Sequence, residues 1–213
     1  MLYPLSYEGV PGVGAGRRAH RLMTLGRQRR DAWAHRAPPC KSGGMATHTY
    51  ALSVTWTGNT GTGTSGYRDY GRGVLARSEG RPDLELSADR PFRGDAGRWN
   101  PEVLLLAALS ECHLLSLLHV AVTHRVTVTA YEDQPLGWME QEGIGGRFTR
   151  VLLRPRVTVT DPAGAELMPR LHQEANRACF IASSVNFPVE HEAQTFVDGT
   201  AGIPPRGMPL AGT

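Results

Sequence analysis

Cys112 and Cys179 are the residues of this 213-residue chain that carry the most specific chemistry. A thiolate is a strong nucleophile, and two thiols that can meet form a disulfide reversibly. The third cysteine, Cys40, lies in a basic N-terminal segment, and three cysteines are too few for a disulfide-stapled scaffold. We expect a cytoplasmic protein in which Cys112 and Cys179 are redox-active, catalytic or simply packed.

The segment "NPEVLLLAALSECHLLSLLHV", residues 100–120, predicts a helix that carries Cys112 near its middle. Asn100 suits the N-cap, Pro101 suits the first helical position, and Glu102 complements the positive end of the helix dipole. The helix is expected to run to about residue 124 and is apolar on nearly every side. Such a helix is either the central helix of the domain or packs against a partner subunit.

Cys112 has small neighbours one helical turn away on each side, Ala108 and Ser116, which leave room around its sulfur. This suits a thiol that a substrate reaches, and it also suits tight helix packing. The helix N-terminus is about 15 Å away, too far to activate the thiol, and His113 points elsewhere. A cysteine in an apolar helix is otherwise inert, so an activating cation must come from outside the helix.

Other chemistries are weakly supported. A cysteine hydrolase needs an imidazole beside the sulfur, which His172 or His191 could supply only through the tertiary structure. The histidines near Cys112 do not share one helix face with it, and no CxxC or HxxxH spacing is present. The glycine-rich residues 61–66 lack the spacing of a dinucleotide or phosphate loop. We therefore predict neither a metal nor a cofactor.

The elements around this helix indicate one α+β domain over residues 45–197. Alternating, β-branched segments predict strands, a glycine-rich stretch at 59–73 predicts a loop or hairpin, and the glycines at 137, 143, 145 and 146 predict a turn. A second, amphipathic helix is expected shortly before Cys179. The strands are expected within residues 49–58, 84–92, 125–133, 148–161 and 183–197, and the second helix at 163–180.

The two ends of the chain differ in composition from this domain. Residues 1–44 contain eight basic and two acidic side chains, a net charge of +6. Because the whole chain has a net charge of +3, residues 45–213 have a net charge of −3. This segment could be a basic arm for nucleic acid, an arginine-rich transit peptide, or sequence upstream of a true start at Met45, the reading we favour. We expect residues 1–44 and 198–213 to be disordered, and the folded part to bind neither nucleic acid nor membrane.

The segment "RWNPEVLLLAALSECHLLSLL", residues 98–118, resembles the signature of the OsmC/Ohr family of peroxidases. In that family a helix that begins Asn-Pro-Glu carries a cysteine ten residues after the glutamate, as Glu102 and Cys112 are spaced here. A second family cysteine follows a second helix, which matches Cys179 in "HQEANRACFIASSVNFPV". The resemblance covers about residues 47–195, and the "CH" and "CFIASSVNFP" variants are similar to an OsmC-like subgroup.

The resemblance implies a thiol-dependent peroxidase that reduces organic hydroperoxides without a cofactor. Cys112 would be the peroxidatic residue and Cys179 the resolving residue, and an external dithiol or lipoylated protein would restore both thiols. It also implies the OsmC-like fold, with antiparallel sheets packed around a long central helix in an interlocked homodimer. The alternative is a non-catalytic OsmC-like protein that senses oxidants or binds an apolar ligand, and a cysteine hydrolase ranks last.

The family also places an arginine, paired with the helix-start glutamate, beside the reactive sulfur. The family position of that arginine falls near Thr62, so Arg68 and Arg72 in the glycine-rich loop are the candidates. Glu102 and Cys112 lie about 15 Å apart along one helix and roughly 80° around it, so one straight helix cannot bring both to one site. We therefore expect a second subunit to supply Glu102, which favours a homodimer.

Overall fold

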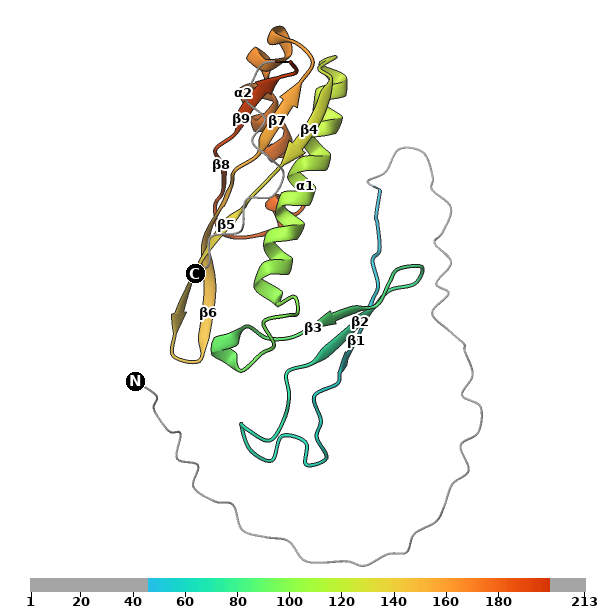
Figure 1. Ribbon diagram of the computed structural model, residues 1–213, viewed down its shortest axis with the longest axis vertical. Coiled ribbons are helices and arrows are strands. Elements are labelled where there is room, and N and C mark those ends of the chain that lie inside the picture. Colours follow the sequence, from blue (N-terminus) through green and yellow to red (C-terminus); the bar gives the residue numbers. More distant parts are fainter. Residues whose placement is uncertain (1–45, 200–213) are drawn as a thin grey trace, which may run out of the picture. The chain divides into compact units, whose positions relative to one another are not determined.

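The computed structural model describes residues 46–199, and those from Tyr50 onward belong to one compact unit. Two helices, two short 3-10 turns and nine strands make up this part of the chain (Figure 1). The predictions for residues 1–44, for the start at Met45 and for almost all of the C-terminal segment lie outside the described residues. Helices and strands mix without strict alternation, which confirms the predicted α+β class.

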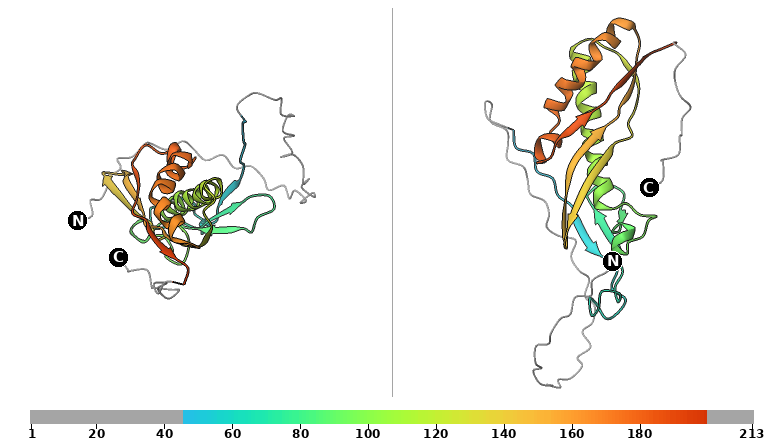
Figure 2. Two further views of the ribbon diagram at one scale, coloured as in Figure 1. Left: turned by 90° about the horizontal axis from the view of Figure 1, so that it is seen from above. Right: turned by 90° about the vertical axis from the view of Figure 1, so that its left-hand side faces the viewer.

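The long helix α1, Pro101–Thr123, forms as its sequence predicts (Figure 1). The Asn100 side chain accepts a hydrogen bond from the backbone N–H of Val103 at 2.8 Å, which satisfies one of the free donors at the helix start. Its length and apolar composition alone would also suffice to cross a bilayer. In this fold, however, α1 packs against α2, Pro162–Ala178, and the two helices lie side by side (Figure 2).

The strands form three separate three-stranded sheets. The first is wholly antiparallel, and each of the other two joins one antiparallel pair to one parallel pair. Parallel pairing therefore adds to the antiparallel arrangement that was expected. The first sheet holds β1 (Ser53–Trp56), β2 (Val74–Arg77) and β3 (Leu84–Leu86); the second holds β4 (Val128–Glu132), β7 (Arg156–Val159) and β9 (Gln194–Val197); the third holds β5 (Leu136–Glu142), β6 (Gly145–Leu153) and β8 (Val189–His191).

Several details of the predicted strands were wrong. The single strand expected over 183–197 is β8 and β9, which lie in two different sheets, and the strand expected over 84–92 ends at Leu86 and is followed by a 3-10 turn. Gly145 and Gly146, expected in a turn, lie in β6.

The single strand expected over 148–161 is two strands, because Arg154 and the buried Pro155 interrupt it, and proline cannot donate to a sheet ladder. Gly137 lies inside β5 rather than in a turn. A Cβ there would lie 2.7 Å from the ring of Phe148 and 2.8 Å from Leu106, so glycine allows this close packing.

The main core lies between the C-terminal half of α1, one face of α2 and strand β7. Its centre is made of fully buried Leu117, Leu171 and Val157, and a smaller cluster around Leu109 and Val151 packs where α1 meets β6. Burial of one such leucine side chain contributes roughly 1.5–3 kcal/mol.

The opposite face of α1 remains open in the protomer, although its sequence predicted burial on all sides. Leu115 is 57% exposed and Val122 is 75% exposed, and Val103 and Leu118 on the same helix are also exposed. A second apolar stripe runs along the edge strand β1 and the residues before it, where alternate side chains Tyr50, Leu52, Val54 and Trp56 are exposed. Exposed apolar surface of this extent is typical of a protein–protein interface.

Candidate active site

Cys112 and Cys179 are brought together by the packing of α1 and α2, and both are free thiols. Cys112 is partly exposed, whereas Cys179 is 1% exposed. Burial, followed by a hydrogen bond with the Cys112 side chain, raises the pKa of the Cys179 thiol to about 11. At neutral pH Cys179 is therefore a protonated thiol in contact with a more accessible one.

The chain around Cys179 holds its sulfur in a defined position. Cys179 is the C-cap of α2 and has extended backbone angles. The backbone N–H and the hydroxyl of Ser183 both donate to the Cys179 carbonyl at 3.0 Å, and the N–H of Ala182 donates to its Sγ at 3.4 Å. This turn after the helix fixes the thiol at the end of α2, where α1 passes.

Glu102 lies in the first turn of α1, partly buried, and one of its carboxylate oxygens is buried without a hydrogen-bond partner. No ion pair or hydrogen bond joins Glu102 to Cys112 or to any arginine among residues 46–199. A buried carboxylate oxygen without a partner is unfavourable, so this position favours a cation that the described protomer does not supply.

The two candidate arginines lie in the loop between β1 and β2, and neither contacts Cys112 within the described residues. Arg68 is exposed. The guanidinium of Arg72 lies over the rings of Tyr67 and Tyr70, at 4.5 Å and 3.9 Å from their centroids, and donates to the carbonyl oxygens of the same two tyrosines. The role of both arginines therefore stays a prediction, and Arg72 is held by its own loop.

His172 and His191, the residues that a cysteine hydrolase would need, contact His113 instead of a thiol. His113 Nε2 and His172 Nδ1 are 3.0 Å apart, and the ring of His191 lies 5.6 Å from each of the other two. Both His113 and His172 are fully buried. Desolvation, with the neighbouring histidine charges as the smaller cause, lowers the pKa of His113 to about 4 and of His172 to about 3.

This histidine cluster, His113, His172 and His191, has no signal in the sequence, because its members come from α1, α2 and β8. Side-chain spacing along a chain reveals only groups on one element. For the same reason, the spacing of residues along the chain does not show that Cys112 and Cys179 are in contact. Only the packing of the two helices and the strand brings these residues together.

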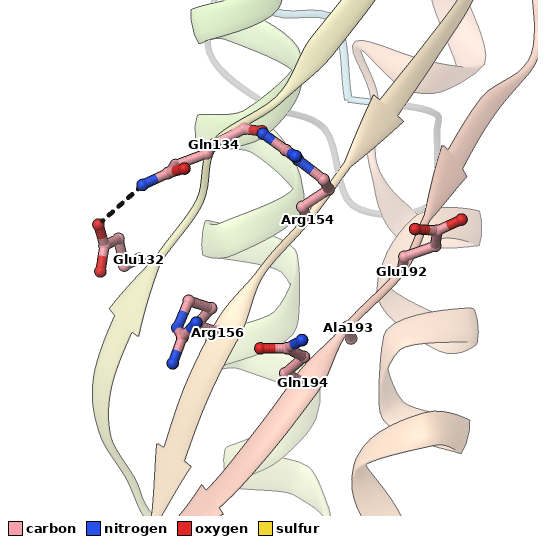
Figure 3. A pocket seen from close by; sticks show the side chains of 7 residues that line it. All are labelled: Glu132, Gln134, Arg154, Arg156, Glu192, Ala193 and Gln194. Atoms are coloured by element: carbon pink, nitrogen blue, oxygen red, sulfur yellow. Dashed lines mark hydrogen bonds between the residues drawn. The ribbon is translucent and has the colours of Figure 1, made fainter. Parts of the chain in front are cut away.

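A surface pocket of about 520 Å³ lies where the chain passes from one sheet to the next (Figure 3). Figure 3 shows Arg156 and Gln194 on neighbouring strands, with Glu132 hydrogen-bonded to Gln134. The lining contains no cysteine and no aromatic side chain, so it offers neither a nucleophile nor an apolar wall. The residues that line it are Glu132, Gln134, Arg154, Arg156, Glu192, Ala193 and Gln194.

Several solved structures are similar to this fold. An OsmC-like protein of unknown function from Vibrio cholerae O1 biovar eltor is 28% identical, with a TM-score of 0.62 over 70% of this chain and all of that one. An organic hydroperoxide resistance protein OsmC from Legionella pneumophila is 19% identical, with a TM-score of 0.52 over 72% of this chain and all of that one. A further organic hydroperoxide resistance protein, from Elizabethkingia anophelis, is 17% identical, with a TM-score of 0.51 over the same shares.

The two matches below 20% identity show a shared fold alone. No curated protein matches the sequence. The family model described as OsmC-like protein matches residues 94–194, which include α1 with Cys112 and the turn with Cys179. Together with the fold and the paired thiols, these matches confirm the resemblance of this chain to OsmC-like proteins.

Proposed function

We propose that this protein is a thiol-dependent peroxidase that reduces organic hydroperoxides. The observation that carries the proposal is the contact of a partly exposed thiol, Cys112, with a buried thiol, Cys179, in a chain whose structural neighbours include organic hydroperoxide resistance proteins. A hydroperoxide can reach the first sulfur, and the second is already beside it. A reaction that ends in a disulfide needs this arrangement.

The reaction proceeds in two steps. The Cys112 thiolate attacks the outer oxygen of the hydroperoxide, the O–O bond breaks, and the alcohol leaves with a proton while Cys112 becomes a sulfenic acid. The Cys179 sulfur then attacks the Cys112 sulfur, and the hydroxyl leaves as water with the Cys179 proton. An external dithiol, small or protein-bound, reduces the resulting disulfide. The raised pKa of Cys179 keeps it protonated during the first step and makes Cys112 the first nucleophile.

We also propose that two copies of the chain form a homodimer. A second copy would cover the open face of α1, where Leu115 and Val122 are exposed, and the apolar stripe along β1. The unpartnered oxygen of Glu102 would then meet a cation from a neighbouring chain, with Arg68 as the freer candidate because Arg72 is held by its own tyrosines. This arrangement would supply the charge that the Cys112 helix lacks.

Stoichiometric oxidation tests the peroxidase. Reduced Cys40→Ser protein, which keeps only the two site thiols, is mixed with one equivalent of cumene hydroperoxide and followed by thiol titration and mass spectrometry. We expect rapid loss of two thiols and a Cys112–Cys179 disulfide. Cys179→Ser should stop at a sulfenic acid, and Cys112→Ser should react no faster than an ordinary thiol. Oxidation of the parent protein at that slow rate would refute the proposal.

The dimer is tested separately by sedimentation velocity of the parent protein and of Leu115→Glu. We expect the parent to sediment as a dimer and the variant as a monomer with an unchanged far-ultraviolet circular dichroism spectrum. A matched variant, Ile144→Glu, changes a fully exposed apolar side chain in the β5–β6 turn and should leave the dimer intact. A monomeric parent at micromolar concentration would contradict the proposed assembly.

The second candidate function is a non-catalytic sensor of oxidants or a binder of apolar ligands. The observation that favours it is the absence of any cation beside Cys112 in the described part of the protomer. Under this alternative the disulfide forms, but turnover with excess hydroperoxide and dithiothreitol stays slow. Multiple-turnover rates in the same Cys40→Ser protein separate the two functions.

A further inference from the structure

The histidine cluster joins the three elements that lie around the two thiols. His113 follows Cys112 on α1, and His172 lies two helical turns before Cys179 on α2. His191 ends β8, which the chain reaches through the turn after Cys179, and its ring centroid lies 5.6 Å from those of the other two. The cluster therefore links the helix of the first thiol to the elements on either side of the second.

A hydrogen bond crosses the interface between α1 and α2 at this cluster. His113 Nε2 and His172 Nδ1 are 3.0 Å apart, both rings are fully buried, and their planes differ by only 9°. Leu117, one turn after His113, and Leu171, next to His172 in the sequence, belong to the apolar core. A directional polar bond therefore lies inside a core that otherwise holds the helices together through apolar contacts.

This bond adds little to the stability of the fold. Within the described residues, His113 Nδ1 and His172 Nε2 are buried without a hydrogen-bond partner. The net gain from one neutral hydrogen bond does not exceed the cost of burying two such nitrogens. What the bond supplies is direction, because it forms in one relative position of the rings, whereas apolar side chains pack in several. A single buried polar residue fixes the register of coiled-coil helices in this way.

The contact between the thiols depends on the same register. A disulfide forms when the Cα atoms of its two cysteines lie about 4.4–6.8 Å apart. A shift of α2 by one residue against α1 moves it by about 1.5 Å along its axis and rotates it by about 100°. Such a shift would carry Cys179 away from Cys112 and would also break the bond between the two rings. The hydrogen bond and the thiol contact therefore occur in one register.

We propose that His113 and His172 are positioning residues, which hold α1 and α2 in the register that lets Cys112 bond to Cys179. His191 packs against both rings and ties β8 to the same place. No hydrogen bond joins these rings to a thiol among residues 46–199, so they act through the helices and not on the sulfur atoms. Their importance for catalysis rests on the proposed peroxidase function, in which this disulfide completes the reaction.

The effective concentration of the two thiols toward each other measures this alignment. Cys40→Ser protein is equilibrated in buffers of reduced and oxidised glutathione, quenched with acid and analysed by mass spectrometry. Cys112 and Cys179 lose two electrons and two protons to oxidised glutathione, which becomes two molecules of reduced glutathione, and the equilibrium ratio gives the effective concentration. Because no hydroperoxide is present, this value does not depend on whether the protein is an efficient peroxidase.

The main variant replaces both His113 and His172 with phenylalanine, which keeps the ring volumes and leaves neither partner unpaired. It should stay folded, and the effective concentration should fall by roughly two- to tenfold, the range that the loss of one neutral hydrogen bond gives. His113→Gln, whose amide takes the place of Nε2, should keep the parental value. Leu117→Ala, which opens a cavity one turn away in the same interface, should keep it too.

A double variant with the parental effective concentration would overturn the proposal. An equal fall in Leu117→Ala would overturn it as well, because ordinary packing would then explain the effect. If the double variant does not fold, His113→Leu takes its place, and it should show a lower value than His113→Gln. Equal values in these two single variants would refute the positioning role.

Discussion

Acidification below about pH 6.5 should steeply lower the stability of this protein, at pH values well above those at which carboxylates titrate. The His113–His172 pair is the reason. Each ring has a pKa of 6.5 when the chain is unfolded, against about 4 for His113 and about 3 for His172 when it is folded. The unfolded chain therefore binds more protons below pH 6.5, so the stability is intact above that pH and is lost as the pH falls.

The loss in the free energy of unfolding is set by how far the pH falls below 6.5. One pH unit corresponds to about 1.4 kcal/mol for a group that is protonated only in the unfolded chain. Between pH 6.5 and pH 5, each ring therefore lowers the free energy of unfolding by roughly 2 kcal/mol, and the pair by roughly 4 kcal/mol. A small domain is typically stable by about 5–15 kcal/mol, so this loss is a large fraction of the total.

Urea denaturation at pH 7.5 and pH 5 measures this difference in the free energy of unfolding. Replacing both rings with phenylalanine removes the titrating groups and keeps a similar volume, so the variant should lose roughly 4 kcal/mol of the pH dependence. His119→Gln, the exposed histidine on the same helix, is the matched control. A double variant that keeps the full pH dependence of the parent would refute the reasoning, because the titrating groups would then lie elsewhere.

Three further predictions test the site and the fold. Limited iodoacetamide at pH 8 should alkylate Cys112 well before Cys179, as peptide mass spectrometry will show, because Cys179 is buried and its pKa is raised to about 11; modification of Cys179 first would contradict the assigned roles. Asn100→Ala should lower the free energy of unfolding by about 1 kcal/mol in urea denaturation through loss of the helix cap, and an unchanged value would mean that the cap is not used. Leu117→Ala should lower it by about 2–5 kcal/mol, whereas Ile144→Ala, at a fully exposed position, should change it by less than about 0.5 kcal/mol.

Local sequence patterns were sufficient for the elements that depend on neighbouring residues. The start of α1 follows from Asn100, Pro101 and Glu102, whose cap, backbone and charge preferences act within one helical turn. The second helix was found from its amphipathic pattern despite Pro169 within it. The spacing of Glu102 and Cys112, together with Cys179 farther on, was specific enough to predict the resemblance to OsmC-like proteins.

Patterns failed where the conformation depends on distant contacts. Gly137 resembles a turn residue, but it lies in β5 because the ring of Phe148 and the side chain of Leu106 occupy the space of a Cβ. The uniform apolarity of α1 predicted burial on every side. The protomer buries only one face of it, because α2 and the strands pack against that face alone.

The sequence by itself therefore determined the helix that carries Cys112, the second cysteine, the α+β class and the resemblance to OsmC-like proteins, because these depend on local propensity and on spacing along the chain. Only the tertiary structure decided that Cys112 touches Cys179, that Arg72 is held by its own loop, and that three histidines meet in the core. Each of these depends on how α1, α2 and the strands pack, and residues from different elements become neighbours only through packing.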